Sequence, residues 1–313
     1  MNSVTHLISR LAKAVAIGAV LAPTALFALD VDLSPEQKGR VHVEKVPEAI
    51  AAISKDYKFV KDGFLTVATT PFELPLDSYA NDTKTPIGNE PDIAQLIADS
   101  LGLKLEIVAV AWPDWPLGLA SGKFDAVISN VTVTEARKEK FDFSTYRVDA
   151  LGFYVKADND KIKSITEPKD VAGLKVIVSS GTNQEQILLN WIKKNKEAGL
   201  AATEIQYYDD AAVRRLAIES GRVDADLEPN ATEAFYAAQK AKTKLVGIVN
   251  GGWPLSAEIA VATKKGGGLA DAITLALNAQ IKNGNYAKVL SHWGLDAEHI
   301  DQSRTNPPGL PKS

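Results

Sequence analysis

From residue 65 onward, short apolar runs alternate with amphipathic stretches, the pattern of buried strands separated by helices. In the first part of the chain the pattern predicts strands over 65–69, 104–110 and 126–129, with helices over 90–101 and 117–121. After a strand over 150–156, it predicts strands over 175–180, 205–208, 225–228 and 245–249, with helices over 184–194, 211–220 and 231–242. Two successive runs of this kind indicate an α/β fold with mostly parallel sheets flanked by helices.

The rest of the pattern leaves the topology open. A further strand is expected over 257–263 and two helices over 269–282 and 286–293, which fit either a completed second unit or a return to the first. The tail from Asp301 holds three prolines and is expected to fray. Residues 29–62 are polar and mixed, with a helix expected over 46–55.

The first 28 residues predict a secretory signal. Arg10 and Lys13 precede an apolar run over 15–28, which Pro23 interrupts and Asp30 follows. The alternative is an uncleaved membrane anchor, but the run is short for a bilayer crossing. We expect cleavage after Ala28 and export to the periplasm.

Composition narrows the function classes. A chain of 313 residues suits two domains, and its net charge of −4 argues against a broad nucleic-acid surface. The absence of cysteine excludes disulfides and thiolate catalysis. His292 and His299 are too loosely spaced for a metal site, and the chain carries neither a P-loop nor a Gly-x-Ser-x-Gly elbow. We therefore expect no metal, no cofactor and no catalytic residues.

The segment 122–144 is the most informative for chemistry. A short strand runs into Ser129, Asn130 and Thr132, and a helix begins at Thr134 with Arg137 in its first turn. Hydroxyls, free backbone N–H groups and a guanidinium around one point suit a small carboxylate. The alternatives are a hydrogen-bonded strand end and a surface arginine in a basic run.

Six motifs follow one another along the chain: GKFDA (122–126), TEARKEK (134–140), FDFS (141–144), GLKV (173–176), SGT (180–182) and GRVDA (221–225). With these motifs the chain resembles the bacterial extracellular solute-binding proteins of the polar amino-acid uptake family (family 3), which serve ABC transporters. The resemblance covers about residues 63–295.

This resemblance implies a two-lobed periplasmic-binding-protein fold of type II, with ligand bound between lobes joined by two hinge crossovers. Lobe 1 is then expected over 63–154 plus 252–300 and lobe 2 over 158–247, with the hinge at 150–156 and near 245–253. The implied partners are a small-molecule ligand (an amino acid or related carboxylate) and a membrane permease, with no nucleic acid; we expect a monomer.

The resemblance also implies roles for single residues. Arg137 matches the arginine that clamps the ligand carboxylate, and Ser129, Asn130 and Thr132 match hydrogen-bond donors to the ligand. Thr182 and Asn183 match the place where lobe 2 offers backbone N–H groups; the alternative is that Thr182 merely caps its helix.

Two departures from the family pattern concern the ligand. Where relatives usually carry the aspartate that receives the ligand ammonium, this chain has Pro229, and Glu228 one residue earlier is the substitute; the alternative is an exposed glutamate at a strand end. The ligand-stacking aromatic falls in the loop 69–76, where one register places Glu73 and the other Thr69 at that position, with Phe72 nearby.

Two tryptophans follow the second predicted strand. Trp112 and Trp115 fall in a loop that faces the cleft in relatives, and for each of them core packing is the alternative.

The leading interpretation is thus a periplasmic receptor that closes by hinge motion around its ligand and does not catalyse a reaction. An alternative is an exported cyclohexadienyl (prephenate or arogenate) dehydratase on the same fold, with Glu228 as the acid. A third class is a ligand-sensing module that acts through a separate membrane receptor chain.

Overall fold

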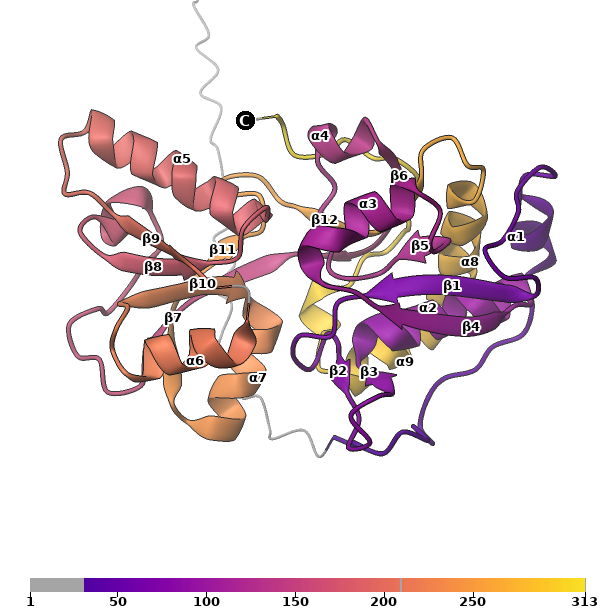
Figure 1. Ribbon diagram of the computed structural model, residues 1–313, viewed down its shortest axis with the longest axis horizontal. Helices are drawn as coiled ribbons and strands as arrows, with labels where there is room; N and C mark the ends of the chain where they lie inside the picture. The colour runs from indigo at the N-terminus through magenta and orange to yellow at the C-terminus, as the bar shows by residue number, and fades with distance from the viewer. Residues whose placement is uncertain (1–30, 209, 313) are drawn as a thin grey trace, which may run out of the picture.

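The computed structural model describes residues 31–208 and 210–312. The predicted signal sequence, 1–28, lies outside the described residues. The chain forms two five-stranded sheets, each flanked by helices, and a small two-stranded ribbon of β2 (Ser78–Tyr79) and β3 (Pro86–Ile87) (Figure 1). We call the half built on the first sheet lobe 1 and the half built on the second sheet lobe 2.

The sheet of lobe 1 has the strand order β4-β1-β5-β12-β6. β1 runs parallel to β4 and β5, whereas β12 runs antiparallel to β5 and β6. The strands are β1 (Phe64–Thr69), β4 (Lys104–Ala109), β5 (Ala126–Val127), β6 (Phe141–Val148) and β12 (Glu258–Lys264). The helices are α1 (Pro47–Ala51), α2 (Asn89–Leu101), α3 (Trp115–Ala120), α4 (Glu135–Lys138), α8 (Ala270–Lys282) and α9 (Asn285–His292).

Both faces of this sheet are buried. Successive residues of a strand point to opposite faces. Accordingly, Val67 of β1 packs with α2, α8 and α9, while the next residue, Ala68, packs with Trp115 and Leu119 of α3. Two buried faces explain why β1 and β12 are near-continuous apolar runs in the sequence.

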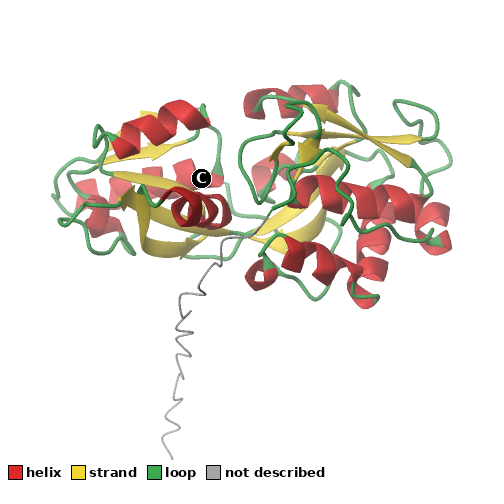
Figure 2. Cartoon of the chain, turned by 90° about the horizontal axis from the view of Figure 1, so that it is seen from below, coloured by secondary structure: helices red, strands yellow, loops and turns green. Residues whose placement is uncertain are grey.

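The sheet of lobe 2 has the strand order β11-β7-β10-β8-β9. Its strands are β7 (Ala150–Lys156), β8 (Lys175–Val178), β9 (Glu204–Tyr207), β10 (Ala225–Pro229) and β11 (Thr243–Asn250). Its helices are α5 (Asn183–Glu197), α6 (Ala211–Glu219) and α7 (Asn230–Lys240). Trp191 of α5 packs on Phe153 of β7, and α6 covers Ile177 on the opposite face. Helices surround the strands of both lobes in the view from below (Figure 2).

The chain passes between the lobes twice. β6 ends at Val148 and β7 begins at Ala150 in the other sheet; the return runs from the end of β11 to the start of β12. The Asp149 N–H donates to the Ala257 carbonyl (3.0 Å), and the Gly251 N–H donates to the Asp149 carbonyl (3.1 Å), so the two passages are hydrogen-bonded. The strand over 150–156 pairs along its length within lobe 2, and the first passage therefore precedes it.

The C-terminal elements return to lobe 1, which resolves the open topology: β12 lies in the first sheet and α8 packs on α2. The expectation that the tail frays was wrong. Thr145 donates its N–H to the Arg304 carbonyl (3.1 Å), and the Asn306 N–H donates to the Phe143 carbonyl (2.9 Å). β6 is an edge strand, and the tail pairs with its otherwise unpaired backbone groups.

The segment before β1 covers lobe 1 from outside. Val41, Val43 and Val46 pack against the α2–α8 core, and the Arg40 guanidinium lies 2.7 Å from the Asp92 carboxylate. The expected helix over 46–55 is shorter and spans only Pro47–Ala51. Within residues 31–208 and 210–312, no helix has the length and apolar character that a bilayer crossing requires.

Candidate functional site

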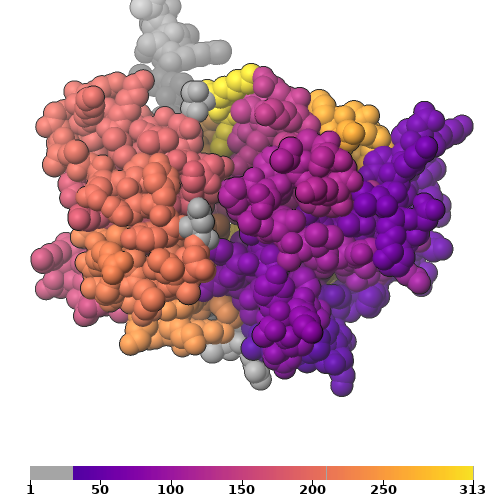
Figure 3. Space-filling view, in the orientation of Figure 1, coloured from indigo at the N-terminus to yellow at the C-terminus, as the bar shows by residue number. Residues whose placement is uncertain are grey.

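The two lobes meet along a seam across the middle of the molecule (Figure 3). A cavity of about 280 Å³ lies there, which we call the first cavity. It lies at the carboxyl ends of β1, β4, β5, β8 and β10, the edge of an α/β sheet where ligands usually bind. Its lining residues come from both lobes: Thr70–Glu73, Leu76, Asp77, Glu90, Val110–Pro113, Ser129, Asn130, Ser179, Thr182–Gln184, Glu228, Pro229 and Thr232.

A second cavity of about 440 Å³ adjoins the first one. Thr182 and Asn183 line both cavities, whereas Arg137 and Gly181 line only the second. Seven of the nine predicted binding residues therefore surround the first cavity. Arg137 lies behind the shared wall, and buried Thr132 lines neither cavity.

Arg137 bridges the two lobes through backbone carbonyls. Its Nη1 donates to the Thr132 carbonyl (2.9 Å) in lobe 1, and its Nη2 donates to the Gly181 carbonyl (3.0 Å) in lobe 2. The guanidinium carbon lies 5.5 Å from the centroid of the Trp112 ring and 5.8 Å from that of Trp115. Burial lowers the pKa of Arg137 to about 10, partly offset by the Asp149 charge, so Arg137 stays cationic at neutral pH.

Thr132 and the α4 start hold Arg137 in place. The Thr134 hydroxyl accepts the Arg137 N–H (3.1 Å) and caps the short helix α4. The Thr132 hydroxyl is buried without a hydrogen-bond partner among the described residues. Thr132 therefore holds Arg137 through its backbone carbonyl and not through its hydroxyl.

Ser129 and Asn130 line the first cavity directly after β5. The Ser129 hydroxyl accepts the N–H of Thr70 (3.1 Å), which joins the β5 and β1 loops. Asn130 has a left-handed backbone (φ 50°), uncommon for a residue with a side chain, and its Oδ1 accepts from Arg147. Arg147 is buried between Glu90 and Glu298, so a charged cluster beneath the cavity orients Asn130.

The start of α5 supplies the lobe 2 wall. The Thr182 hydroxyl accepts the Glu185 N–H (3.2 Å) and donates to the Ser179 carbonyl (2.7 Å), so Thr182 caps its helix as well as lining both cavities. Asn183 donates from Nδ2 to Asp149 Oδ2 (2.8 Å) and to the Gly251 carbonyl (2.6 Å). The side chain of Asn183 thus ties α5 to the two passages between the lobes.

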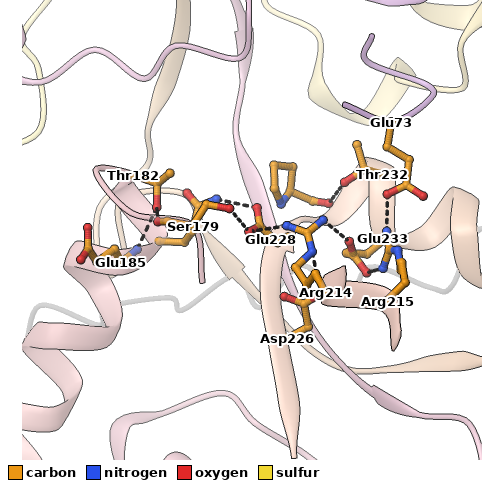
Figure 4. Close-up of polar contacts among 12 residues, drawn as sticks. Glu73, Ser179, Thr182, Glu185, Arg214, Arg215, Asp226, Glu228, Thr232 and Glu233 are labelled. Carbon is orange, nitrogen blue, oxygen red and sulfur yellow. Dashed lines mark hydrogen bonds and ion pairs between the residues drawn. The ribbon is translucent and has the colours of Figure 1, made fainter. Parts of the chain in front are cut away.

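Glu228 is buried at the end of β10 and is already paired. It accepts from the Ser179 hydroxyl (2.8 Å) and from Gln184 Nε2 (2.8 Å), and Arg214 Nη1 lies 2.6 Å from its Oε1 (Figure 4). The next residue, Pro229, also lines the cavity and precedes α7. Glu228 therefore presents a neutralised carboxylate to the cavity, unlike an exposed strand-end glutamate.

A network of ion pairs lies behind Glu228 in lobe 2. Arg214 is fully buried and also lies 3.3 Å from Asp226 and 3.5 Å from Glu233. Arg215 pairs with Glu233 and, across the seam, with Glu73 of lobe 1 (Figure 4). Burial raises the pKa of Asp226 well above its ordinary range, although Arg214 opposes the shift.

Sequence reasoning missed Arg214 and Arg215. The only available signal was two adjacent arginines on a helix expected to be amphipathic, near the alternating acids of β10.

The loop after β1 carries the remaining lobe 1 residues. Phe72 lines the cavity, and the Arg214 guanidinium carbon lies 4.4 Å from the centroid of its ring. Glu73 also lines the cavity and pairs with Arg215. Burial raises the pKa of Glu73 to about 7 despite the Arg215 charge. This loop therefore contacts lobe 2 through one aromatic ring and one carboxylate.

The two tryptophans have different surroundings. Trp112 is half-buried and lines the first cavity, whereas Trp115 is buried in the core against Phe141 (ring centroids 5.0 Å apart). The two indole rings meet edge to face with centroids 6.0 Å apart. Trp115 thus supports Trp112 from behind.

The fold and the position of the cavity define a two-lobed binding protein of type II. The sequence profile of the bacterial extracellular solute-binding proteins, family 3, matches residues 65–296, and the chain belongs to this family. Among curated relatives, the L-cystine-binding protein TcyJ of Escherichia coli (strain K12) is 29% identical over 221 residues, which cover 70% of this chain and 78% of TcyJ.

Two solved structures are similar. An ancestral arginine-binding protein bound to arginine has a TM-score of 0.64 and 32% identity, covering 74% of this chain and 98% of its own. The ancestral amino acid-binding protein AncCDT-1, a precursor of cyclohexadienyl dehydratase, has a TM-score of 0.64 and 28% identity, covering 74% and 95%. These likenesses confirm the predicted family and fold class.

Proposed function

We propose that this chain is the periplasmic substrate-binding component of an ABC transporter. It binds an amino acid or a related carboxylate in the first cavity and delivers it to a membrane permease. The relatives named above, which bind cystine or arginine, support the class of ligand. The observation that carries the proposal is a cavity lined by both lobes beside a cationic residue that reaches both.

In this proposal, Arg137 is the partner of the ligand's carboxylate. Its two guanidinium hydrogen bonds go to neutral carbonyls, which leaves its charge without an ion-pair partner among the described residues. A carboxylate accepts two parallel hydrogen bonds from a guanidinium and is a stronger partner than a carbonyl. A ligand carboxylate at the Thr182–Asn183 wall would also lie at the N-terminal end of α5, where anions are favoured.

Closure follows from the same arrangement. Ligand that contacts both lobes stabilises the arrangement in which the lobes meet, and a hinge at the paired passages around Asp149 and Gly251 permits the movement. The closed form is then the one that docks on the permease. In this proposal the protein acts as an exported monomer after removal of residues 1–28.

Ligand release tests the proposal. Native protein is purified without amino acids, denatured, and its low-mass fraction analysed by mass spectrometry; the stripped, refolded protein is then screened against the amino acids by thermal shift. We expect one class of amino acid in the fraction and the same class to raise the melting temperature, with a 1:1 stoichiometry. An empty fraction together with no shift for any amino acid would contradict the proposal.

The dehydratase alternative is supported by the likeness to AncCDT-1, a precursor of cyclohexadienyl dehydratase. The candidate acid, Glu228, is paired with Arg214 and accepts hydrogen bonds from the Ser179 hydroxyl and from Gln184, so its carboxylate is already engaged within lobe 2. We therefore propose that the protein is not an enzyme. Incubation with prephenate or arogenate is expected to yield no product, and turnover would reverse this conclusion.

A further inference from the structure

The first cavity is lined by four carboxylates: Glu73, Asp77, Glu90 and Glu228. Of the described residues that line it, none is Lys, Arg or His. The charge of the lining is therefore set by how far each carboxylate is neutralised from behind.

Three of the four carboxylates are neutralised by arginines outside the lining. Glu73 pairs with Arg215 across the seam. Glu90 Oε1 lies 3.1 Å from Arg147 Nη2, and Glu228 lies 2.6 Å from Arg214.

Asp77 is the exception. Its residue is only 2% exposed, and neither carboxylate oxygen has a hydrogen-bond partner among the residues that the structure describes. No ion pair within those residues includes Asp77. The Thr69 hydroxyl, buried in the same place, also has no hydrogen-bond partner.

Such a carboxylate is costly to the folded protein. An ionised, buried carboxylate without a partner loses its hydration, and no hydrogen bond or ion pair compensates for that loss. Burial, with a smaller contribution from the Glu90 charge, raises the pKa of Asp77 well above its ordinary range. A buried acid with no structural partner beside a cavity indicates that its partner arrives with the ligand.

The loop presents Asp77 rigidly. The Phe72 N–H donates to the Asp77 carbonyl (2.9 Å), and the Asp77 N–H donates to the Glu73 carbonyl (3.2 Å). On the other side, the Leu76 carbonyl accepts the N–H of Glu90 (2.9 Å), and a Cβ on Gly88 would come within 2.4 Å of this carbonyl oxygen. The loop is therefore fixed to the start of α2, and Asp77 is preorganised.

We propose that Asp77 receives a cationic nitrogen group of the ligand, so that the cavity selects an amino acid with an ammonium or guanidinium group held by lobe 1. This inference rests on the function proposed above and deepens it. The rings of Phe72 and Trp112 in the lining also suit a cation, because an aromatic face attracts positive charge. The ammonium recognition that Pro229 removes from lobe 2 is thereby supplied from the opposite lobe.

Matched probe pairs test the inference by calorimetry on stripped wild-type protein. L-Arginine against L-citrulline, and L-lysine against L-norleucine, remove the side-chain charge; L-lysine against 6-aminohexanoate removes the α-ammonium. In at least one pair, we expect the probe that carries the tested positive charge to bind about tenfold or more tightly than the analogue that lacks it. The pair that shows the preference identifies which nitrogen Asp77 receives.

Asp77→Asn is expected to abolish this preference by weakening the charged probe about tenfold or more, and Asp77→Glu to restore part of it. The matched control is Asp62→Asn, which changes an exposed aspartate that forms no ion pair within the described residues and is expected to leave all affinities unchanged. Asp77→Asn is also expected to be at least as stable to urea as wild type, because it removes a buried unpaired acid. A purely structural role would instead lower stability.

Three results would overturn the inference: equal wild-type affinity within every pair, an undiminished preference in Asp77→Asn, or an Asp77→Asn protein whose stability falls while its preference is kept. If neutral amino acids bind and cationic ones do not, the inference fails while the proposed function stands. If no amino acid of any kind binds, the proposed function itself fails.

Discussion

The two walls of the first cavity differ in how their charges are balanced. On the lobe 2 side, Arg214 and Arg215 neutralise Asp226, Glu228 and Glu233 before any ligand arrives. On the lobe 1 side, Glu73 and Glu90 are paired with arginines, but Asp77 has no partner among the described residues. Arg137, also of lobe 1, lies behind the wall shared with the second cavity and donates only to carbonyls.

This contrast separates two properties of a binding site, a fixed shape and the recognition of ligand charge. A wall whose charges are already paired has a fixed shape and does not compete for the charges of a ligand. A wall with unpaired buried charge stabilises a ligand of complementary charge, because binding relieves a desolvation cost that the protein already carries. In the function proposed here, lobe 1 therefore discriminates between ligands by charge, while lobe 2 closes the cavity and contributes shape and neutral hydrogen bonds.

Removing the cation at the centre of the lobe 2 network should have the largest effect. Arg214→Met leaves Asp226, Glu228 and Glu233 without the guanidinium that lies within 3.5 Å of all three. Breaking a buried ion pair by deleting one partner costs about 3–5 kcal/mol. Urea unfolding should show a loss of this order.

Arg222→Met is the matched control, because this arginine is exposed on the turn before β10. It should unfold like wild type. Equal stability of Arg214→Met and Arg222→Met would mean that the lobe 2 charges are not balanced by Arg214, and the contrast between the walls would be lost.

The next largest effect should be on affinity in lobe 1. Arg137→Ala removes the guanidinium beside the shared Thr182–Asn183 wall, and a desolvated ligand carboxylate then loses its partner. We expect about 2–5 kcal/mol of binding free energy to be lost for the amino acid identified in the release experiment, measured by calorimetry.

Lys138→Ala, which removes a neighbouring cation paired with Glu135, should bind normally. Undiminished affinity of Arg137→Ala would show that the carboxylate is held elsewhere.

A smaller effect is expected on the pH dependence of stability, through Glu73, which pairs with Arg215 across the seam. Burial raises the pKa of Glu73 to about 7, and of Glu298 likewise to about 7, from ordinary values of 4.5. A raised carboxyl pKa means that the folded state binds more protons than the unfolded state between these values. Its stabilising contribution is present at low pH and is lost as pH rises through about 7.

The free energy of unfolding should therefore fall between pH 5 and pH 8, and Glu73→Gln should make this fall shallower. Glu44→Gln, at an exposed position, should keep the wild-type slope. An unchanged slope in Glu73→Gln would show that Glu73 does not contribute to the pH dependence of the free energy of unfolding.

Much of the fold could be predicted from the sequence because its cores impose periodicity. β7 was predicted with its observed bounds, since it is a continuous apolar run buried on both faces. β6 was missed. Its sequence, FDFSTYRV, carries Asp142, Ser144, Thr145 and Arg147, and their partners lie far away in the chain: Ser144 donates to the Ala270 carbonyl (2.7 Å), and Arg147 pairs with Glu298.

The residues of the candidate site likewise include some that could be predicted from the sequence and one that could not. Ser129, Asn130, Thr182 and Glu228 could be placed near one cavity because each ends a predicted strand or follows one within two residues. Asp77 could not be predicted, because the property that distinguishes it is the lack of any partner for its buried carboxylate among the described residues. An unpaired buried charge is a property of three-dimensional packing, and the letters PLDSYA look like an ordinary polar turn.

The pairing of Glu73 with Arg215 joins positions 142 residues apart. No local pattern in the sequence records such a contact.

The most direct test of the central claim, that one amino acid bridges the two lobes, is an electron spin resonance distance measurement. The chain has no cysteine, so spin labels can be placed at Leu117→Cys on α3 of lobe 1 and Leu216→Cys on α6 of lobe 2, which are 74% and 67% exposed. The account predicts that the amino acid giving the largest thermal shift moves the distance distribution to a shorter and narrower form, saturating at one equivalent. A distribution that stays the same at saturating ligand would contradict it.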